Sequence, residues 1–200
     1  KRNQRTCIKN GEDDHGWRWS YNTCLAYEHD EMNHICVIDN SLSAEECDTL
    51  IKEMSQKLVG PMKEPWNYSF HNITYENEIL SKLVDKIMPQ YKKENPDIDL
   101  TFDSWGLENF KFKQFKPGKY YDKFHSEQGY DQPRVLAILV YLSDHNCGTE
   151  FTNGKIVKSI KGRSLMFPAY WTHTHKGQPC PDNKVRYILS AYATFKKKGG

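Results

Sequence analysis

The hydrophobic period of the chain changes near Trp105, and this change most constrains the fold. Before that point, apolar residues recur at helical spacing in two stretches, whereas afterwards short segments alternate with a period of two. The run "RVLAILVYL" is almost continuously apolar, which is typical of a central strand buried on both faces. Helices followed by about six short strands predict an α+β chain with a mainly β core, in which helices pack on a β-sandwich or distorted barrel.

The two expected helices have different boundary residues. Ser43 and Glu46 have the spacing of a capping box, so the first helix should begin there and place Leu50 and Met54 on one apolar face. A second helical period covers residues 76–91. Pro89 should end this helix or kink its last turn, because proline lacks the backbone N–H that a helix interior needs.

Composition and local polarity divide the chain into three parts. Residues 1–34 are polar and without a helical period, so we expect an irregular arm. Its aromatic residues would either pack as a small separate core or cover a site as a lid; they are Trp17, Trp19, Tyr21 and Tyr27. Residues 35–195 should form the main domain, and residues 196–200 a short basic tail.

Charge, apolar runs and cysteines narrow the functional class. The chain has 28 Lys and Arg against 26 Asp and Glu, a balance that does not call for nucleic acid or an anionic membrane as partner. No run approaches the roughly 20 apolar residues of a membrane span. We therefore expect a cytoplasmic protein. The six cysteines are scattered without a CxxC motif, which favours free thiols, although a Cys7–Cys24 bridge stays open.

A metal-ligating pattern lies in the strand-rich half. His125 and Glu127 are two residues apart, so on a strand both side chains face the same way, and His175 follows on a later strand. Two imidazoles and one carboxylate form a facial triad that leaves open positions on Fe(II). A single His-x-acid pair carries little information, since His29 and Glu31 make another. His173 remains the alternative to His175 as the third ligand.

The order of motifs around these residues resembles a known family. "YYDKFHSE" is followed by "RVLAILVYL", "CGTEF", "KGRSLMFPAYWTHTHKG" and "VRY". This series resembles the 2-oxoglutarate- and Fe(II)-dependent oxygenases of the prolyl 4-hydroxylase-like group, particularly their phage and viral members. The resemblance implies a double-stranded β-helix, or jelly roll, supported by N-terminal helices. The chain departs from the family at Glu127, where Asp is usual, at Cys147, where a second Gly is usual, and at Phe115, where some relatives have a cofactor-binding Tyr.

The resemblance also implies roles for single residues. His125, Glu127 and His175 would bind iron, and Arg186 would bind the distal carboxylate of 2-oxoglutarate, assisted by Tyr141 and Ser190. A guanidinium suits this role because it binds a carboxylate through two parallel hydrogen bonds. Three residues near the expected mouth of the site would grip an extended peptide: Tyr130, Arg134 and Trp171.

The expected function is therefore a dioxygenase that uses Fe(II), 2-oxoglutarate and O₂, with ascorbate as a supporting reductant. It would hydroxylate a prolyl or other residue of a peptide or protein and release succinate and CO₂. Two rivals remain open. The first is a nucleic-acid dealkylase on the same fold, which the near-neutral charge and the absence of a second arginine in "RYILSAYATF" disfavour. The second is a metal-binding jelly roll without turnover.

Overall fold

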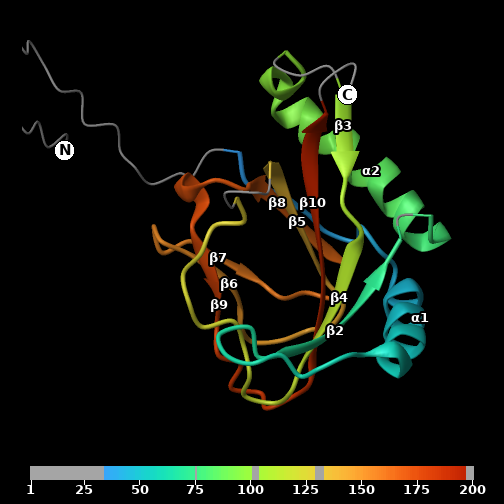
Figure 1. The fold of residues 1–200 in the computed structure, drawn as a ribbon, viewed down its shortest axis with the longest axis vertical. Coiled ribbons are helices and arrows are strands. Elements are labelled where there is room, and N and C mark those ends of the chain that lie inside the picture. Colours follow the sequence, from blue (N-terminus) through green and yellow to red (C-terminus); the bar gives the residue numbers. More distant parts are fainter. Residues whose placement is uncertain (1–33, 75, 101–103, 129–132, 197–200) are drawn as a thin grey trace, which may run out of the picture. The chain divides into compact units, whose positions relative to one another are not determined.

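Two antiparallel β-sheets form the framework of the domain (Figure 1). The computed structural model describes residues 34–74, 76–100, 104–128 and 133–196. The larger sheet has the strand order β1 (Cys36–Ile38), β8 (Arg163–Pro168), β5 (Arg134–Tyr141), β10 (Arg186–Lys196), β4 (Phe110–Phe115) and β2 (Tyr68–Ile73), with β3 (Ser104–Leu107) also paired to β10. The smaller sheet has the order β7 (Ile156–Lys158), β6 (Gly148–Phe151) and β9 (His175–Gly177).

Helices α1 (Ala44–Met54) and α2 (Glu78–Glu94) lie on one side of the larger sheet, opposite the smaller sheet (Figure 1). The helix start at Ser43 is confirmed: the Ser43 hydroxyl accepts from the Glu46 N–H, and the Glu46 carboxylate accepts from the Ser43 N–H. Short 3₁₀ segments occupy Ser55–Lys57, Pro96–Asp99 and Trp171–His173. In the part of the chain that the structure describes, no helix is long and apolar enough to cross a membrane.

One face of the larger sheet packs against the helices, and the other faces the smaller sheet. Phe110 and Phe112 of β4 point to the core that the helices cover, together with Leu189 of β10. The alternate residues of the same strands, Phe115 and Ile188, point to the space between the two sheets. Burial on both faces explains why β5 is almost continuously apolar. The expected jelly-roll class with a mainly β core is confirmed.

Helix α2 differs from the sequence prediction. It does not end at Pro89 but continues to Glu94. The side chain of Tyr91 explains the extension, because its ring is fully buried in the core and its hydroxyl donates to the carbonyl of His34. One missing N–H bond is outweighed by that burial.

The cysteines also differ from the expectation of free thiols. Cys147 and Cys180 form a disulfide, so the prediction is wrong for this pair. Cys36 and Cys47 are free and buried. Cys7 and Cys24 lie outside the described residues, as does the whole predicted arm up to residue 33. The disulfide was not predictable from spacing, since the two cysteines are separated by 33 residues.

Candidate active site

Two histidines are brought together by a single pair of backbone hydrogen bonds. The N–H of His125 donates to the carbonyl of His175, and the N–H of His175 donates to the carbonyl of His125, each over 3.0 Å. Their side chains therefore stand beside each other, with ring centroids 4.5 Å apart. The segment at His125 thus continues the smaller sheet beyond β9.

Glu127 completes a cluster of three possible metal ligands. Its N–H donates to the carbonyl of Ala169, which turns the side chain toward the histidines. Glu127 Oε1 lies 3.4 Å from His125 Nε2 and 3.6 Å from His175 Nε2. The ligand atoms of all three residues lie within 4.8 Å of one another.

The hydrogen bonds of the imidazoles define their tautomers. His125 Nδ1 lies 3.0 Å from the carbonyl of Lys123, and His175 Nδ1 lies 3.0 Å from the carbonyl of His173. Because a carbonyl can only accept, each Nδ1 carries a proton, and each Nε2 faces the shared point, where a neutral imidazole would present its lone pair. Burial raises the pKa of Glu127, but the two imidazoles and the charge of Lys113 lower it well below its ordinary value. The cluster therefore brings two imidazole Nε2 atoms and one carboxylate to a shared point.

His173, the alternative third ligand, lies elsewhere. Its Nδ1 is 2.9 Å from the hydroxyl of Thr172, and its ring lies parallel to that of Phe167. It lines a different hollow, beside α2. The structure thus brings His175, and not His173, next to His125 and Glu127. The other His-x-acid pair, His29 and Glu31, lies outside the described residues.

Arg186 lies in the same cavity as the three-residue cluster. It is only 2% exposed, and its guanidinium packs over the ring of Phe115 at 4.8 Å. Its Nη1 contacts the two disulfide sulfurs and the carbonyl of Gln178, whereas its Nε has no hydrogen-bond partner among the described residues. Burial lowers the pKa of Arg186 to about 10. A buried cation without a carboxylate partner is costly, so the cavity is suited to an anion.

The other two residues predicted to hold the co-substrate do not line this cavity. The hydroxyl of Tyr141 donates to Thr149 Oγ1 over 2.7 Å, and it is Thr149 that lines the wall. Ser190 is fully buried, and its hydroxyl has no hydrogen-bond partner among the described residues. Neither residue lines the cavity, and Tyr141 reaches it through Thr149.

The residues predicted to grip a substrate lie in different places. Arg134 lines a second, polar hollow that shares His125 and Glu127 with the first. Its guanidinium binds both carboxylate oxygens of Glu108 at 2.7 Å and packs over the ring of Tyr192. Trp171 is 79% exposed and lines neither hollow. Tyr130 lies outside the described residues.

Sequence reasoning missed three residues that line both hollows, Tyr68, Lys113 and Tyr121. Burial lowers the pKa of Lys113 to about 8. The Tyr121 ring lies 4.0 Å from that of His125, and the Tyr121 carbonyl accepts from the N–H of Gly177. The sequence did contain a signal for Lys113. It is two residues before Phe115 on β4, so both side chains share the face of the strand that is opposite Phe112.

Comparison with solved structures identifies the class of fold, which is that of the prolyl hydroxylases. No family model matches the chain, and no curated protein sequence matches it. The viral collagen prolyl hydroxylase of Paramecium Bursaria Chlorella virus-1, solved as a 2-oxoglutarate complex, matches with a TM-score of 0.64 and 23% identity over 81% of this chain and 96% of that chain.

Two cellular proteins share the same fold. A Pseudomonas putida prolyl-4-hydroxylase matches with a TM-score of 0.64 and 16% identity, over 83% of this chain and 95% of that chain. A Trichoplax adhaerens prolyl hydroxylase, in complex with a peptide of hypoxia inducible factor, has a TM-score of 0.64 and 15% identity, over 82% and 84%. At these identities the likeness establishes the fold, and it agrees with the family resemblance of the motifs.

Proposed function

We propose that residues 35–195 form an Fe(II)- and 2-oxoglutarate-dependent oxygenase that hydroxylates a prolyl or other residue of a peptide. One observation carries the proposal: a buried arginine, with no carboxylate partner among the described residues, lies in the same cavity as a cluster of two imidazole nitrogens and one carboxylate. The cluster of His125, Glu127 and His175 alone would not need Arg186 to bind a metal, and an anion site alone would not need the cluster.

The residues of the cluster fit iron as resident metal. His125, Glu127 and His175 offer a 2-His-1-carboxylate donor set, which would hold Fe(II) and leave positions open for a co-substrate. The carbonyls of Lys123 and His173 hold each imidazole in the tautomer that presents Nε2. When bound, iron, 2-oxoglutarate and O₂ together would supply the oxidising chemistry that converts a C–H bond to C–OH, with one oxygen atom of O₂ entering the product and the other entering succinate, and CO₂ as the further co-product.

The co-substrate site is proposed at the Arg186 end of the cavity. The unpartnered Nε of Arg186 fits a carboxylate acceptor, and Thr149 adds a hydroxyl that Tyr141 holds in place. Phe115 and Ile188 make the surrounding wall apolar, so water is excluded and the ion pair is strengthened. Ser190 shares the face of β10 with Arg186 and Ile188 but does not line the cavity, so it would act through its neighbours.

The substrate site is proposed at the polar hollow that opens on the other side of the cluster. Trp66 and Tyr68 offer aromatic surface for a proline ring, and Gln128 offers an amide for the peptide backbone. The solved neighbours that act on collagen or are bound to a hypoxia inducible factor peptide support a peptide as substrate class. Arg134 would position Glu127, since its Nη1 lies 3.9 Å from Glu127 Oε2. Tyr130 and Trp171 remain proposed contacts for the more distant parts of the peptide.

The decisive test is turnover with a proline-containing peptide library. Purified protein is incubated with Fe(II), 2-oxoglutarate, ascorbate and O₂, and both succinate and the gain of one oxygen atom by a peptide are measured by mass spectrometry. We expect both, in equal amounts. Succinate release coupled to an alkylated oligonucleotide would favour the dealkylase, and no succinate with either substrate would favour a non-catalytic metal-binding module. The His125→Ala variant is the control for contaminating activity.

A further inference from the structure

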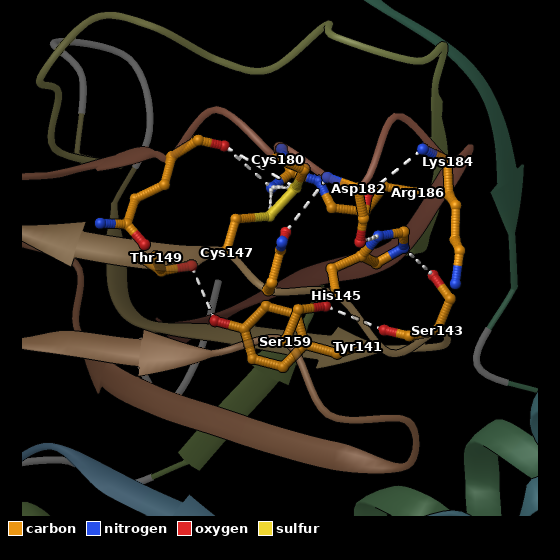
Figure 2. The surroundings of a disulfide bond; sticks show 12 residues. Tyr141, Ser143, His145, Cys147, Thr149, Ser159, Cys180, Asp182, Lys184 and Arg186 are labelled. Atoms are coloured by element: carbon orange, nitrogen blue, oxygen red, sulfur yellow. Dashed lines mark hydrogen bonds and ion pairs between the residues drawn. A yellow bond between two sulfur atoms is a disulfide. The ribbon is translucent and has the colours of Figure 1, made fainter.

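A second group of metal-ligating side chains surrounds the disulfide (Figure 2). Cys147 directly precedes β6, and Cys180 follows β9. His145 stands two residues before Cys147, and Asp182 stands two residues after Cys180. The ligand atoms of His145, Cys180 and Asp182 lie within 4.8 Å of one another, and Cys147 is bonded to Cys180.

This group is a built and largely buried site. The His145 side chain is 1% exposed and the Asp182 side chain 15%, and His145 Nδ1 lies 2.8 Å from Asp182 Oδ2. The other ring nitrogen of His145 lies 2.9 Å from the hydroxyl of Ser143. A disulfide that served only as a cross-link would need neither a buried imidazole nor a carboxylate beside it.

The two segments are held together by bonds that do not depend on the disulfide. The segment that carries Cys147 is anchored to Ser159: the N–H of His145 donates to the carbonyl of Ser159, and the N–H of Ser159 donates to the carbonyl of Cys147. Across the gap, the N–H of Asp182 donates to the side chain of Asn146, and the N–H of Gln178 donates to the carbonyl of Gly148. The donor atoms should therefore stay close together when the sulfur–sulfur bond is opened.

The surrounding charge fits a metal thiolate. Two thiolates, one carboxylate and a divalent ion together carry one negative charge. Arg186 Nη1 lies 3.2 Å from Cys147 Sγ and 3.4 Å from Cys180 Sγ, so its positive charge compensates this negative charge. Two sulfurs, one imidazole nitrogen and one carboxylate oxygen are donors that suit tetrahedral Zn²⁺.

We propose that Cys147, Cys180, His145 and Asp182 form a redox-controlled site for a thiophilic divalent cation of the Zn²⁺ type. Under oxidising conditions the site is closed as a disulfide. Two molecules of a thiol reductant reduce the disulfide to two thiols and become a disulfide themselves. The cation then binds both sulfurs and displaces two thiol protons, while His145 and Asp182 complete the shell. The site is separate from the iron cluster and does not depend on catalysis.

Cobalt is the probe, because thiolate-bound Co²⁺ has a near-ultraviolet charge-transfer band that an imidazole and carboxylate site lacks. The full chain is reduced with a phosphine, freed of reductant without air, and titrated with Co²⁺. We expect the thiolate band in the reduced protein and its absence in the oxidised protein. His125→Ala should keep the band while binding one fewer Co²⁺ per chain, whereas Cys147→Ser and Cys180→Ser should lose it.

Two further variants test the remaining ligand assignment. Asp182→Asn should weaken Co²⁺ binding by at least about tenfold while the thiolate band persists at saturation. Cys24→Ser is the matched control and should leave both band and affinity unchanged. A band that survives Cys147→Ser and Cys180→Ser but disappears with Cys24→Ser would overturn the proposal, as would no band in the reduced protein.

A measurement on the unmutated chain covers the case in which a cysteine variant fails to fold. Reduced protein with and without Zn²⁺ is alkylated, and each cysteine is followed by peptide mass spectrometry. We expect Zn²⁺ to slow the alkylation of Cys147 and Cys180 together, by at least about tenfold. Equal alkylation of these two residues with and without Zn²⁺ would refute the site whatever the variants do.

Discussion

At the scale of single residues, unbalanced buried charge is the strongest indication of function. Arg186 is buried against the Phe115 ring with its Nε unpartnered, and the electrostatic cost of such a cation is relieved only by an anion. Arg163, in contrast, binds both carboxylate oxygens of Asp39 at the surface. Arg163 thus has a structural role, whereas Arg186 keeps a hydrogen-bond donor available for an anion.

Replacing Arg186 should affect the co-substrate and leave the metal. In Arg186→Ala, we expect the 2-oxoglutarate concentration for half-maximal turnover to rise roughly 10- to 100-fold, because hydrogen bonds to a charged group contribute about 1.5–3 kcal/mol. The binding of Mn²⁺ should be unchanged. Arg163→Ala is the control and should alter neither quantity. An unchanged 2-oxoglutarate requirement in Arg186→Ala would remove this residue from the site.

At the scale of elements, the ends of helices and turns carry stability that is local in sequence. In Ser43→Ala, helix α1 loses the hydroxyl that accepts from the Glu46 N–H. We expect a loss of about 1 kcal/mol and a fall in Tm of roughly 2–4 °C, measured by calorimetry. Ser81→Ala, on the exposed face of α2, should leave Tm within about 1 °C, because an exposed helix position prefers Ala. Equal effects of the two substitutions would mean that the cap contributes nothing.

Two glycines distinguish backbone strain from steric clash. Gly154 and Gly162 both have a positive φ, of 86° and 80°. A Cβ on Gly154 would meet nothing within 4 Å, whereas a Cβ on Gly162 would lie 2.3 Å from the carbonyl oxygen of Leu42. Gly154→Ala should therefore cost about 1–2 kcal/mol, and Gly162→Ala roughly 3 kcal/mol or more. Chemical denaturation measures both, and a smaller loss for Gly162→Ala would contradict the close packing of this turn on the segment before α1.

At the scale of the whole molecule, the candidate active site ties together chain segments that are distant in sequence. His125 and Glu127 come from the segment after β4, and His175 opens β9, with β5 to β8 between them. A metal ion bound by all three residues would favour the folded state over the unfolded chain, in which these residues are far apart.

Metal binding should therefore raise thermal stability. With Mn²⁺ at about one hundred times its Kd, the folded state gains about 2.7 kcal/mol, so Tm should rise by roughly 5–10 °C. The shift should disappear in His125→Ala and with excess chelator. His71→Ala, on β2 and outside the cluster, should keep it. A shift that survives His125→Ala would indicate that Mn²⁺ binds elsewhere.

The local pattern of residues was sufficient for a large part of the fold and for the core of the candidate site. The two-residue spacing of His125 and Glu127 implies a shared direction on extended backbone, and the structure has both side chains at one point. The capping box at Ser43 is likewise a local pattern, complete within four residues. Lys113 could have been found from the same alternation, because it shares a face with Phe115.

Contacts between distant segments could not be predicted from local sequence patterns. Pro89 predicted a helix end, but the burial of Tyr91 in the core extends α2. Tyr141 and Ser190 lie on the expected strands, yet neither lines the cavity, and the position of β6 puts Thr149 between Tyr141 and the cavity. The pairing of Cys147 with Cys180 depends on where two loops meet.

The sequence by itself determined which segments alternate apolar and polar residues as strands do, that a helix begins at Ser43, and which side chains can bind a metal. Periodicity and capping involve neighbours along the chain. Only the tertiary structure decided that His175 rather than His173 faces His125, since a reciprocal backbone pair across 50 residues sets that choice. It also buried Arg186, which has no carboxylate partner in the part of the chain that the structure describes, and brought Cys147 to Cys180. Burial and pairing of this kind are properties of the packed sheets, in which every contact depends on the positions of all the strands.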